Sequence, residues 1–370
     1  MERTDQPDSG VDAPVISVLV PIYNVEQYLD ECLASLAAQT FDSFEVICIN
    51  DGSKDGSRDI IERYLQADSR FRVIDKPNSG YGASMNRGMA EARGTYIGIL
   101  ESDDFMEPDG LALLHQAITT HDADVAKANF WMYWSVPEER DEFFEVFTPD
   151  QCDRVVDPAT ETDIFYAKPS IWSALYRRAF LEENGIKFLE TPGASFQDLG
   201  FTFKVWASTH QVTYVYRAII HYRQDNEQSS VNSMGKVNAV FDEYGEIGRW
   251  LDAHPAQRDV FAVVKAKMMY DSCIWNYERV AEKHKVELLT LTRDAFLAEQ
   301  QAGNIDLRLF EPWKLTGLQT IMTSPARYHA EHRGAPPTGL LIDKIRHHWR
   351  AGGPGEVLRI ARRKLTGKAG

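Results

Sequence analysis

The fold is decided by residues 15–57, which read VISVLVPIYNVEQYLDECLASLAAQTFDSFEVICINDGSKDGS. Two short apolar runs, residues 15–20 and 44–49, stand on either side of a stretch in which apolar residues from Leu29 to Leu36 recur at helical spacing. A strand, a helix and a strand in this order are typical of a βαβ unit, whose two strands pair in parallel. The stretch therefore predicts an α/β fold.

The same alternation continues as far as residue 104. Residues 71–74 and 95–100 are predicted as a third and a fourth strand, each preceded by a helix, over residues 60–65 and 80–93. Parallel strands end at a common edge, and ligands of open α/β sheets bind outside that edge. We therefore expect a Rossmann-like, mostly parallel sheet with its ligand site at the carboxyl edge.

The pattern changes along the rest of the chain. The predicted elements are a helix over 109–120, a strand over 125–134, a segment over 171–184 that starts apolar and becomes helical, and strand-like runs over 212–216 and 218–222. Two long helical stretches, over 236–253 and 256–285, then indicate a helical C-terminal domain. The predicted division is a flexible leader 1–14, an α/β domain 15–234, a helical domain 235–330 and a basic tail 331–370.

The composition excludes several classes of protein. The 370 residues are 44% hydrophobic and 26% charged, as in ordinary globular proteins. Forty Lys and Arg against 55 Asp and Glu give a net charge of −15, so a general nucleic-acid binder is not expected, because phosphate backbones need a basic surface. The four cysteines are scattered without a C-x-x-C pair, which favours a reduced, cytoplasmic compartment.

The two ends of the chain bear on localisation. Residues 1–14 are acidic and lack an export signal's apolar core, and no run approaches the roughly 20 apolar residues that cross a bilayer. Residues 335–370 carry eight basic and two acidic side chains, and Leu341, Ile345 and Trp349 share one helical face. This tail is interpreted either as an anchor on the anionic inner face of the plasma membrane or as a helix that docks on the protein's own acidic body.

Acidic residues follow the fourth predicted strand. Glu101, Asp103 and Asp104 come directly after a buried run, at the expected ligand edge. Carboxylates are hard oxygen ligands of the kind that Mg²⁺ or Mn²⁺ takes together with substrate phosphates. The alternative is a solvated loop or a helix cap, which is the usual meaning of a short Asp-x-Asp motif.

Several segments together resemble the nucleotide-sugar half of family 2 glycosyltransferases with the GT-A fold. In order, they are VLVPIYN at 18–24, NDGSKDGS at 50–57, NSG at 78–80, SMNRG at 84–88 and LESDD at 100–104. The resemblance covers about residues 15–230 and continues more weakly as WSALYR at 172–177, SFQDLGF at 195–201 and YRQDNEQSS at 222–230. It is most specific for binding of the sugar donor.

The resemblance implies roles for individual residues. The uracil-like base would be held by Pro21, Tyr23 and Asp51, the ribose and sugar by Asn78, Gly80 and Asn86, the diphosphate by Arg223 and Ser229, and the metal by Asp103. Arginine suits the diphosphate because its fork donates two parallel hydrogen bonds. Asp51 could instead form only a local turn, and Gly80 could serve merely to open a helix.

The chain departs from the family pattern at two acids. Glu101 stands where the metal motif usually begins with Asp, so it would hold either the metal or the ribose. Gln197-Asp198 stands where the family typically has Glu-Asp. Asp198 is predicted to be the general base that removes a proton from the acceptor hydroxyl. The alternative is that it caps a helix beginning near Leu199.

The predicted function is that of a metal-dependent, inverting glycosyltransferase. It would use Mg²⁺ or Mn²⁺ and move a sugar from a UDP-linked donor to a hydroxyl of a surface glycan or a lipid-linked oligosaccharide. One alternative is a non-catalytic scaffold that binds nucleotide sugars, in which the departures from the family pattern at Glu101 and Gln197 reflect a loss of catalytic activity. A nucleotidyltransferase is disfavoured, since no Gly-rich phosphate loop follows the first strand.

Overall fold

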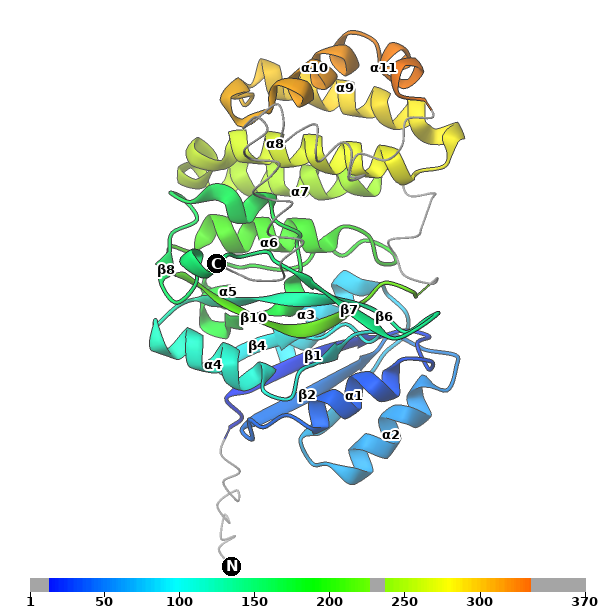
Figure 1. The fold of residues 1–370 in the computed structure, drawn as a ribbon, viewed down its shortest axis with the longest axis vertical. Coiled ribbons are helices and arrows are strands. Elements are labelled where there is room, and N and C mark those ends of the chain that lie inside the picture. The colour runs from blue at the N-terminus through cyan, green and yellow to red at the C-terminus, as the bar shows by residue number, and fades with distance from the viewer. Residues whose placement is uncertain (1–12, 227–236, 334–370) are drawn as a thin grey trace, which may run out of the picture. The chain divides into compact units, whose positions relative to one another are not determined.

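The computed structural model describes residues 13–226 and 237–333 (Figure 1). The strands are β1 Ile16–Ile22, β2 Phe44–Asn50, β3 Phe71–Asp75, β4 Tyr96–Ile99, β5 Phe105–Met106, β6 Val125–Trp134, β7 Arg140–Phe144, β8 Val155–Val156, β9 Ala174–Arg177 and β10 Val212–Arg223. The helices are α1 Leu29–Ala37, α2 Ser57–Ala67, α3 Tyr81–Glu91, α4 Gly110–Thr120, α5 Arg178–Glu183, α6 Gln197–Ser208, α7 Ala239–Ala253, α8 Pro255–Arg279, α9 Lys285–Gln301, α10 Pro312–Thr323 and α11 Pro325–His332.

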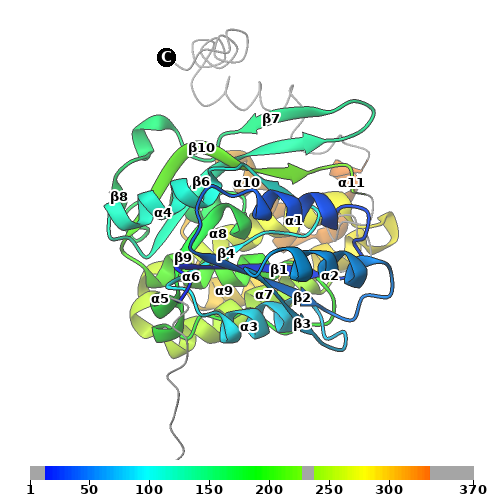
Figure 2. The same ribbon diagram turned by 90° about the horizontal axis from the view of Figure 1, so that it is seen from below.

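One sheet forms the centre of the α/β part. Its strand order is β3-β2-β1-β4-β9-β6-β10-β5, with β7 paired to β6 and β8 to β10. Strands β1 to β4 are parallel, as predicted, whereas β9 runs antiparallel to both β4 and β6. Helices α1 and α3 lie on opposite faces of β1–β4 (Figure 2). The chain adds β2 and β3 on one side of β1 and then returns to add β4 on the other side, so right-handed crossovers place α3 across the sheet from α1. The sheet is therefore mixed beyond β4.

The first two strands are buried along their whole length. All seven residues of β1 and all seven of β2 are buried, since helices cover both faces of this part of the sheet. Ser17 and Glu45 are the polar residues within these runs, apart from Asn50 at the end of β2, and the Ser17 hydroxyl donates to the Glu45 carboxylate at 2.7 Å. Arg72 and Arg93 also donate to Glu45, so that its charge is paired.

Two local predictions differ from the structure. The runs 212–216 and 218–222 form one strand, β10, in which register shifts bulge the chain around Arg217 without a turn. Within 171–184, residues 174–177 form the strand β9, because they pair with β4 and β6. Tertiary pairing outweighs local pattern in both places. The helical end of that segment is α5, and Gly185 follows it with a φ of 58°.

The helical C-terminal part is confirmed. Helices α7 and α8 correspond to the two long predicted stretches, although α8 ends at Arg279, before the predicted end at residue 285, and α9, α10 and α11 follow. The chain divides into two compact units, with Met269 ending the first and Tyr270 beginning the second, so that the division falls within α8. The boundary at residue 235 stays a prediction, and the basic tail lies outside the described residues. No described helix has both the length and the apolar character needed to cross a bilayer.

Candidate active site

Asp51 joins the end of β2 to the loop before α3. Its N–H donates to the Ile22 carbonyl at 2.9 Å, and only 5% of the residue is exposed. Its carboxylate accepts hydrogen bonds from the N–H groups of Ser79, at 2.9 Å, and Gly80, at 3.0 Å, and from the Lys76 ammonium. Asp51 therefore links the end of β2 to residues 76–80, which are distant from it in sequence. The local turn bond is made by Asn50, whose amide oxygen accepts from the Ser53 N–H at 3.0 Å.

Four of the residues predicted to bind the sugar donor lie around Asp51. They are Pro21, Tyr23, Asn78 and Gly80. Pro21 is buried within β1, and Tyr23, just past the strand end, is 47% exposed. Asn78 is exposed, and Gly80 is buried with a φ of 91° as the residue just before α3. The structure thus brings together the residues predicted to hold the base and part of the ribose pocket, at the carboxyl edge of β1 and β2.

Helix α3 is fastened to residues 188–193. A Cβ at Gly80 would lie 2.7 Å from the Thr191 carbonyl oxygen, so a larger residue would displace this contact. The Asn86 side chain donates to the Phe188 carbonyl and to the Glu190 carboxylate, both at 2.9 Å, and accepts from the Phe188 N–H. Asn86 therefore positions the segment that leads to Asp198, in addition to its predicted place in the sugar pocket.

The three acids after β4 have different partners. Glu101 accepts from the Tyr81 hydroxyl at 2.7 Å, and Asp103 accepts from the Asn226 amide at 2.8 Å. One oxygen of Asp104 accepts from the Arg223 N–H at 2.8 Å, while the other is buried and has no hydrogen-bond partner among the described residues. Two of these three carboxylates are therefore bonded by residues from α3 and from the stretch just after β10.

The pKa values of Glu101 and Asp104 are raised in part by their negatively charged neighbours. Burial, together with the negative charges of Asp103 and Asp198, raises the pKa of Glu101 to about 8, although the hydrogen bond from the Tyr81 hydroxyl opposes the change. Burial and the neighbouring Asp103 also raise the pKa of Asp104 well above its ordinary value. Like charges that are poorly solvated favour protonation or the binding of a cation.

Asp198 lies in the first turn of α6, facing the same cluster. The helix begins at Gln197 after Phe196, and the Asp198 carboxylate accepts from the Leu199 N–H at 3.0 Å. Burial raises the pKa of Asp198 to about 6, and the positive charge of Lys168 opposes that shift. Asp198 is therefore not the cap residue itself. It is a half-buried carboxylate of the first turn, charged at neutral pH.

Gln197, the residue before Asp198, stabilises the loop that leads into α6. Its side-chain amide donates to the Thr191 hydroxyl at 2.9 Å and accepts from the Ser195 N–H. The residue is buried, and it closes the loop that enters α6. The uncharged Gln197 thus orders residues 191–195 and adds no carboxylate to the site.

Arg223 is the last residue of β10 and is buried. Its guanidinium donates to the Asp103 carbonyl at 2.9 Å and to the Glu31 carboxylate, and lies over the rings of Tyr28 and Tyr133. Arg223 therefore holds the loop that carries Asp103. Its predicted contact with diphosphate stays a prediction, as does that of Ser229, which lies outside the described residues.

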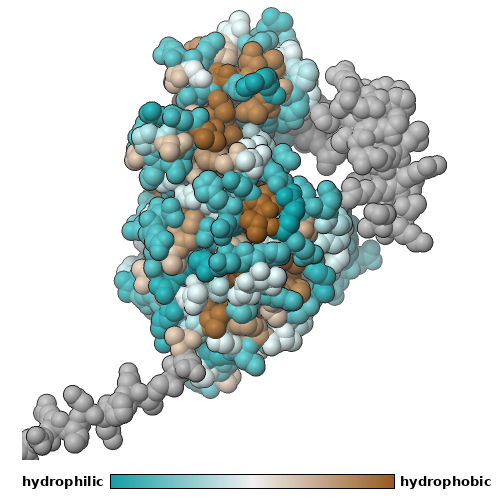
Figure 3. Space-filling view, turned by 90° about the vertical axis from the view of Figure 1, so that its left-hand side faces the viewer, coloured by the Kyte–Doolittle hydropathy of each residue, from teal (hydrophilic) through white to brown (hydrophobic). Residues whose placement is uncertain are grey.

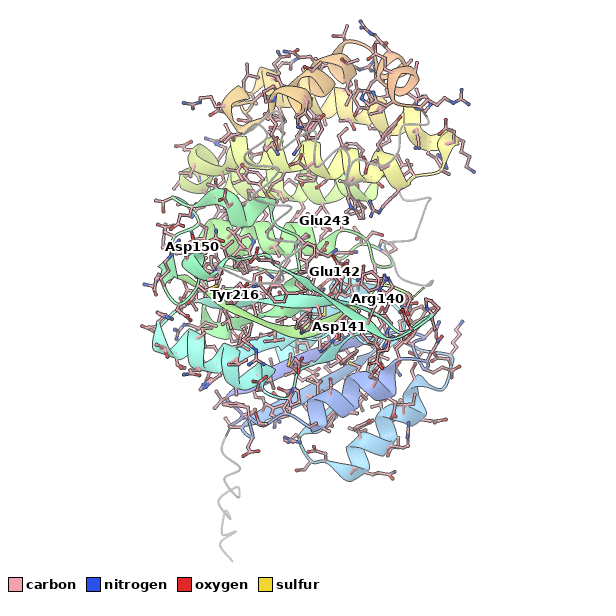
Figure 4. The ribbon with its side chains drawn as sticks, viewed as in Figure 1. Arg140, Asp141, Glu142, Asp150, Tyr216 and Glu243 are labelled. Atoms are coloured by element: carbon pink, nitrogen blue, oxygen red, sulfur yellow. The ribbon has the colours of Figure 1, made fainter. Side chains whose placement is uncertain are left out.

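Three residues near the acids were not singled out from the sequence. Tyr81 and Asn226 adjoin or lie within the quoted motifs NSG and YRQDNEQSS, so position along the chain could have indicated them. Glu243, on α7, is 1% exposed, and Figure 4 labels it near α6. Burial and the charge of Asp198 raise the pKa of Glu243 to about 8, and Lys204 opposes the change. No local pattern marks Glu243, because it stands in an ordinary amphipathic helix.

The site is suited to a divalent cation only in part. Among residues 13–226 and 237–333, no three His, Cys, Asp or Glu side chains form a group ready to hold a metal ion. Nevertheless, Glu101 and Asp103 offer hard oxygen donors, and the unpartnered Asp104 oxygen lies beside them. Mg²⁺ commonly binds one or two carboxylates and takes its remaining ligands from water and substrate phosphates. The donor set therefore fits such an ion together with a diphosphate.

Comparison with known proteins gives a consistent result. The family model described as glycosyl transferase family 2 matches residues 17–142. The putative glycosyltransferase EpsH of Bacillus subtilis (strain 168) is 34% identical over 221 residues, covering 58% of this chain and 62% of EpsH. The glycosyltransferase GlyA of Streptococcus pneumoniae serotype 4 is 31% identical over 217 residues, covering 56% of this chain and 30% of GlyA. This chain thus spans less than two thirds of either relative.

A solved structure shares the fold. TarS 1–349 of S. aureus, in complex with UDP-GlcNAc, superposes with a TM-score of 0.62 at 20% sequence identity, covering 85% of this chain and 89% of that chain. At this level of identity the likeness concerns the fold alone. It confirms the predicted α/β class with a GT-A-like domain and a helical C-terminal part.

Proposed function

We propose that this chain, which belongs to glycosyltransferase family 2 through residues 17–142, moves a sugar from a nucleoside diphosphate donor to a hydroxyl of an acceptor. One observation carries the proposal. Glu101, after β4, lies close enough to both Asp103 and Asp198 for their negative charges to raise its pKa, although about a hundred residues separate Asp198, at the start of α6, from the other two. A donor diphosphate and a proton-accepting base need this combination of charges.

The donor we propose is a UDP-linked sugar. Asp51 is supported as part of the base pocket because it lies at the carboxyl edge beside Pro21 and the exposed Tyr23. Asn78, Gly80 and the other donor residues follow from the family resemblance. The likeness in fold to a protein that was crystallised with UDP-GlcNAc is in keeping with this choice.

Glu101 and Asp103 would hold Mg²⁺ or Mn²⁺, which when bound offsets the charge of the diphosphate. The rest of the proposed reaction uses groups of this chain. The Asp198 carboxylate takes the proton of the acceptor hydroxyl as its oxygen forms a bond to the anomeric carbon. The bond from that carbon to the diphosphate oxygen breaks, and the nucleoside diphosphate leaves from the opposite face, so the configuration inverts. Arg223 keeps Asp103 in place through its bond to the Asp103 carbonyl.

The acceptor we propose is a hydroxyl of a surface glycan or a lipid-linked oligosaccharide. Its support is the basic composition of residues 335–370, which would bring the enzyme to an anionic membrane surface at the cytoplasmic side. The acidic net charge of −15 disfavours nucleic acid as a partner.

A thermal-shift panel tests donor and metal together. We expect UDP-sugars with Mn²⁺ to raise the unfolding temperature more than GDP-sugars do, and EDTA to abolish the effect, because a ligand stabilises the state that binds it. Asp51→Asn should weaken the shift. Asp59→Asn, at an exposed residue of the first turn of α2, is the matched control and should leave it unchanged.

Two results would contradict the proposal. If no nucleoside diphosphate sugar shifts the unfolding temperature, donor binding is wrong. If UDP-sugars bind but no donor is turned over with any acceptor or with water, the non-catalytic scaffold is the better interpretation.

A further inference from the structure

We infer that Glu243, on α7, is a positioning residue that sets the place and charge of the Asp198 carboxylate. The inference rests on the proposed function of Asp198 as the base. Helix α7 lies outside residues 17–142, so the family match does not include Glu243.

Glu243 reaches the helical turn that carries Asp198. Helices α6 and α7 pack together, and a Cβ added at Gly200 would lie only 2.3 Å from the Glu243 Oε2. Gly200 is two residues beyond Asp198 in the first turn of α6. The absence of a side chain at position 200 is thus what admits the Glu243 carboxyl against this turn.

The Glu243 carboxyl is buried with only partial compensation, from the nearby Gly200 N–H and the charge of Lys204. The residue is 1% exposed, and neither carboxylate oxygen has a hydrogen-bond partner within the described parts of the chain. A buried polar group left unpaired destabilises the folded state, and a charged one does so more strongly. An apolar residue at this position in α7 would favour folding. A role in the neighbouring site accounts for a carboxyl that folding alone disfavours.

The groups that face Glu243 determine which acid carries the charge. They are Asp198, Lys204 and the Gly200 N–H on α6, and Glu246 on α7 itself. Lys204 donates to the Lys187 carbonyl and lies 3.9 Å from the Glu246 carboxylate, so it is shared rather than paired with Glu243 alone. The pKa of Glu243 rises to about 8 and that of Asp198 to about 6. At neutral pH Asp198 is therefore ionised and Glu243 keeps its proton.

This order of ionisation suits a base. While Glu243 is neutral, the first turn of α6 carries the single negative charge of Asp198, which is free to accept the acceptor's proton. Once Glu243 ionises, its charge and that of Asp198 repel each other, and no hydrogen bond within the described residues joins the Glu243 carboxylate to Asp198. The Asp198 carboxylate is then displaced from its place in the site, and transfer falls. Because Gln197 is uncharged, the second acid beside this turn is Glu243 of α7.

The test is the pH profile of donor turnover. UDP release from UDP-GlcNAc and UDP-glucose, with Mn²⁺ and water as acceptor, is measured between pH 5 and 10 for the wild type and for Glu243→Gln. We expect the wild-type rate to fall about tenfold between pH 7 and pH 9, as a group with a pKa of about 8 ionises, and Glu243→Gln to lose this alkaline fall. Asp252→Asn, at an exposed residue near the end of α7, is the control and should keep the wild-type profile.

A second pair of variants tests the contact itself. Gly200→Ala should lower UDP release at least tenfold, because its methyl group displaces the Glu243 carboxyl. In a Glu243→Ala background, where the space is free, the same change should cost less than about twofold. Equal losses in both backgrounds would overturn the inference even if Glu243→Gln proved hard to produce.

The outcomes separate the inference from the proposed function. If Asp198→Asn abolishes UDP release but Glu243→Gln keeps the alkaline fall, only the inference is wrong. If the wild type releases no UDP, or if Asp198→Asn releases it at the wild-type rate, the proposed function fails and the inference fails with it.

Discussion

Single hydrogen bonds between distant residues assemble the site. Tyr81 on α3 bonds Glu101 after β4, and Asn226 after β10 bonds Asp103. Asp51 bonds the N–H of Gly80 in the same way. Because each bond joins segments that are far apart in sequence, the position of every carboxylate depends on the complete fold. Single-residue changes should therefore affect the chemistry more than they affect folding.

Asp198→Asn should remove the proposed base while preserving donor binding. General-base catalysis contributes roughly 10²–10⁴-fold, so we expect transfer to fall at least 100-fold. In the wild type, a base with a pKa of about 6 is active only when deprotonated, so kcat/KM should fall about tenfold for each pH unit below 6. Steady-state kinetics between pH 4.5 and 8 measures both effects.

A matched variant supports the interpretation of that experiment. Asp259→Asn changes an exposed aspartate of α8 and should leave the rate and the pH profile unaltered. The thermal shift with UDP-sugar should be equal in Asp198→Asn and in the wild type. Full transfer by Asp198→Asn would show that another group is the base.

At the scale of elements, close backbone contacts decide how α3 meets the segment before α6. A Cβ at Gly82 would lie 2.1 Å from the Leu189 carbonyl oxygen. Glycine at this position therefore lets residues 188–193 lie directly on α3. A bulkier residue would separate Asn86 from Phe188, and with it the donor side of the site from the approach to Asp198.

Gly82→Ala should destabilise the protein although alanine favours helices. We expect a loss of about 1–3 kcal/mol, as is typical of overpacked sites, measured by denaturant unfolding. Gly245→Ala in α7 is the matched control, since its Cβ would find nothing closer than the Arg249 guanidinium at 3.6 Å. The control should gain about 0.5–1 kcal/mol from helix propensity. A stabilised Gly82→Ala would mean that α3 and residues 188–193 separate freely.

The buried Glu45 ties β2 to its neighbours. It accepts from Ser17 on β1, from Arg72 on β3 at 2.7 Å and from Arg93 after α3 at 2.8 Å. Burial opposes its ionisation, but the bonds from Arg93, Arg72 and Ser17 together lower the pKa of Glu45 to about 2. The carboxylate therefore joins three segments of the parallel half of the sheet.

Glu45→Gln should cost about 3 kcal/mol at pH 7, because it leaves Arg72 and Arg93 without their shared charge. The sign with pH follows from the lowered pKa. Since the folded state releases this proton more readily than the unfolded state, the contribution is present above pH 4.5 and is lost as the pH falls toward 2. Urea unfolding at pH 7 and pH 3 measures it. A difference between variant and wild type that is the same at both pH values would contradict this account.

At the scale of the whole molecule, charge is distributed unevenly along the chain. The protein carries −15, while residues 335–370 alone carry eight basic and two acidic residues. Hydrophilic side chains cover most of the face in Figure 3, and the hydrophobic residues on it form separate groups. Binding to an anionic surface therefore has to come from a local basic segment, as the sequence of the tail indicates.

Deleting residues 335–370 should abolish sedimentation with anionic vesicles. Each basic residue near such a surface contributes about 1 kcal/mol, and the attraction weakens as salt is added. Vesicles of phosphatidylserine and phosphatidylcholine are compared with phosphatidylcholine alone at 50 and 500 mM salt. Equal binding by the full chain and the deletion variant would discard the anchor and favour docking of the tail on the protein itself.

The sequence by itself determined the fold class and most elements of the parallel half-sheet. The alternation of apolar runs with helical spacing from residue 15 to 104 predicts β1 to β4 in order, and β6 is found over the predicted residues 125–134. These predictions succeed because strand and helix periodicities are local properties of the chain. The motifs also placed Glu101, Asp103 and Asp51 at the carboxyl edge, where the structure has them.

Only the tertiary structure decided the strand β9, the continuity of β10 and the approach of Glu243 to the helical turn that carries Asp198. Each of these depends on a partner far away in sequence, such as β4 for β9 or Gly200 for Glu243. Burial and distance between side chains are properties of the folded chain, so the charge states of Glu101, Asp198 and Glu243 could not be read from their residue types. The physical reason is that a carboxyl's ionisation depends on the solvent and charges around it, and the fold arranges both.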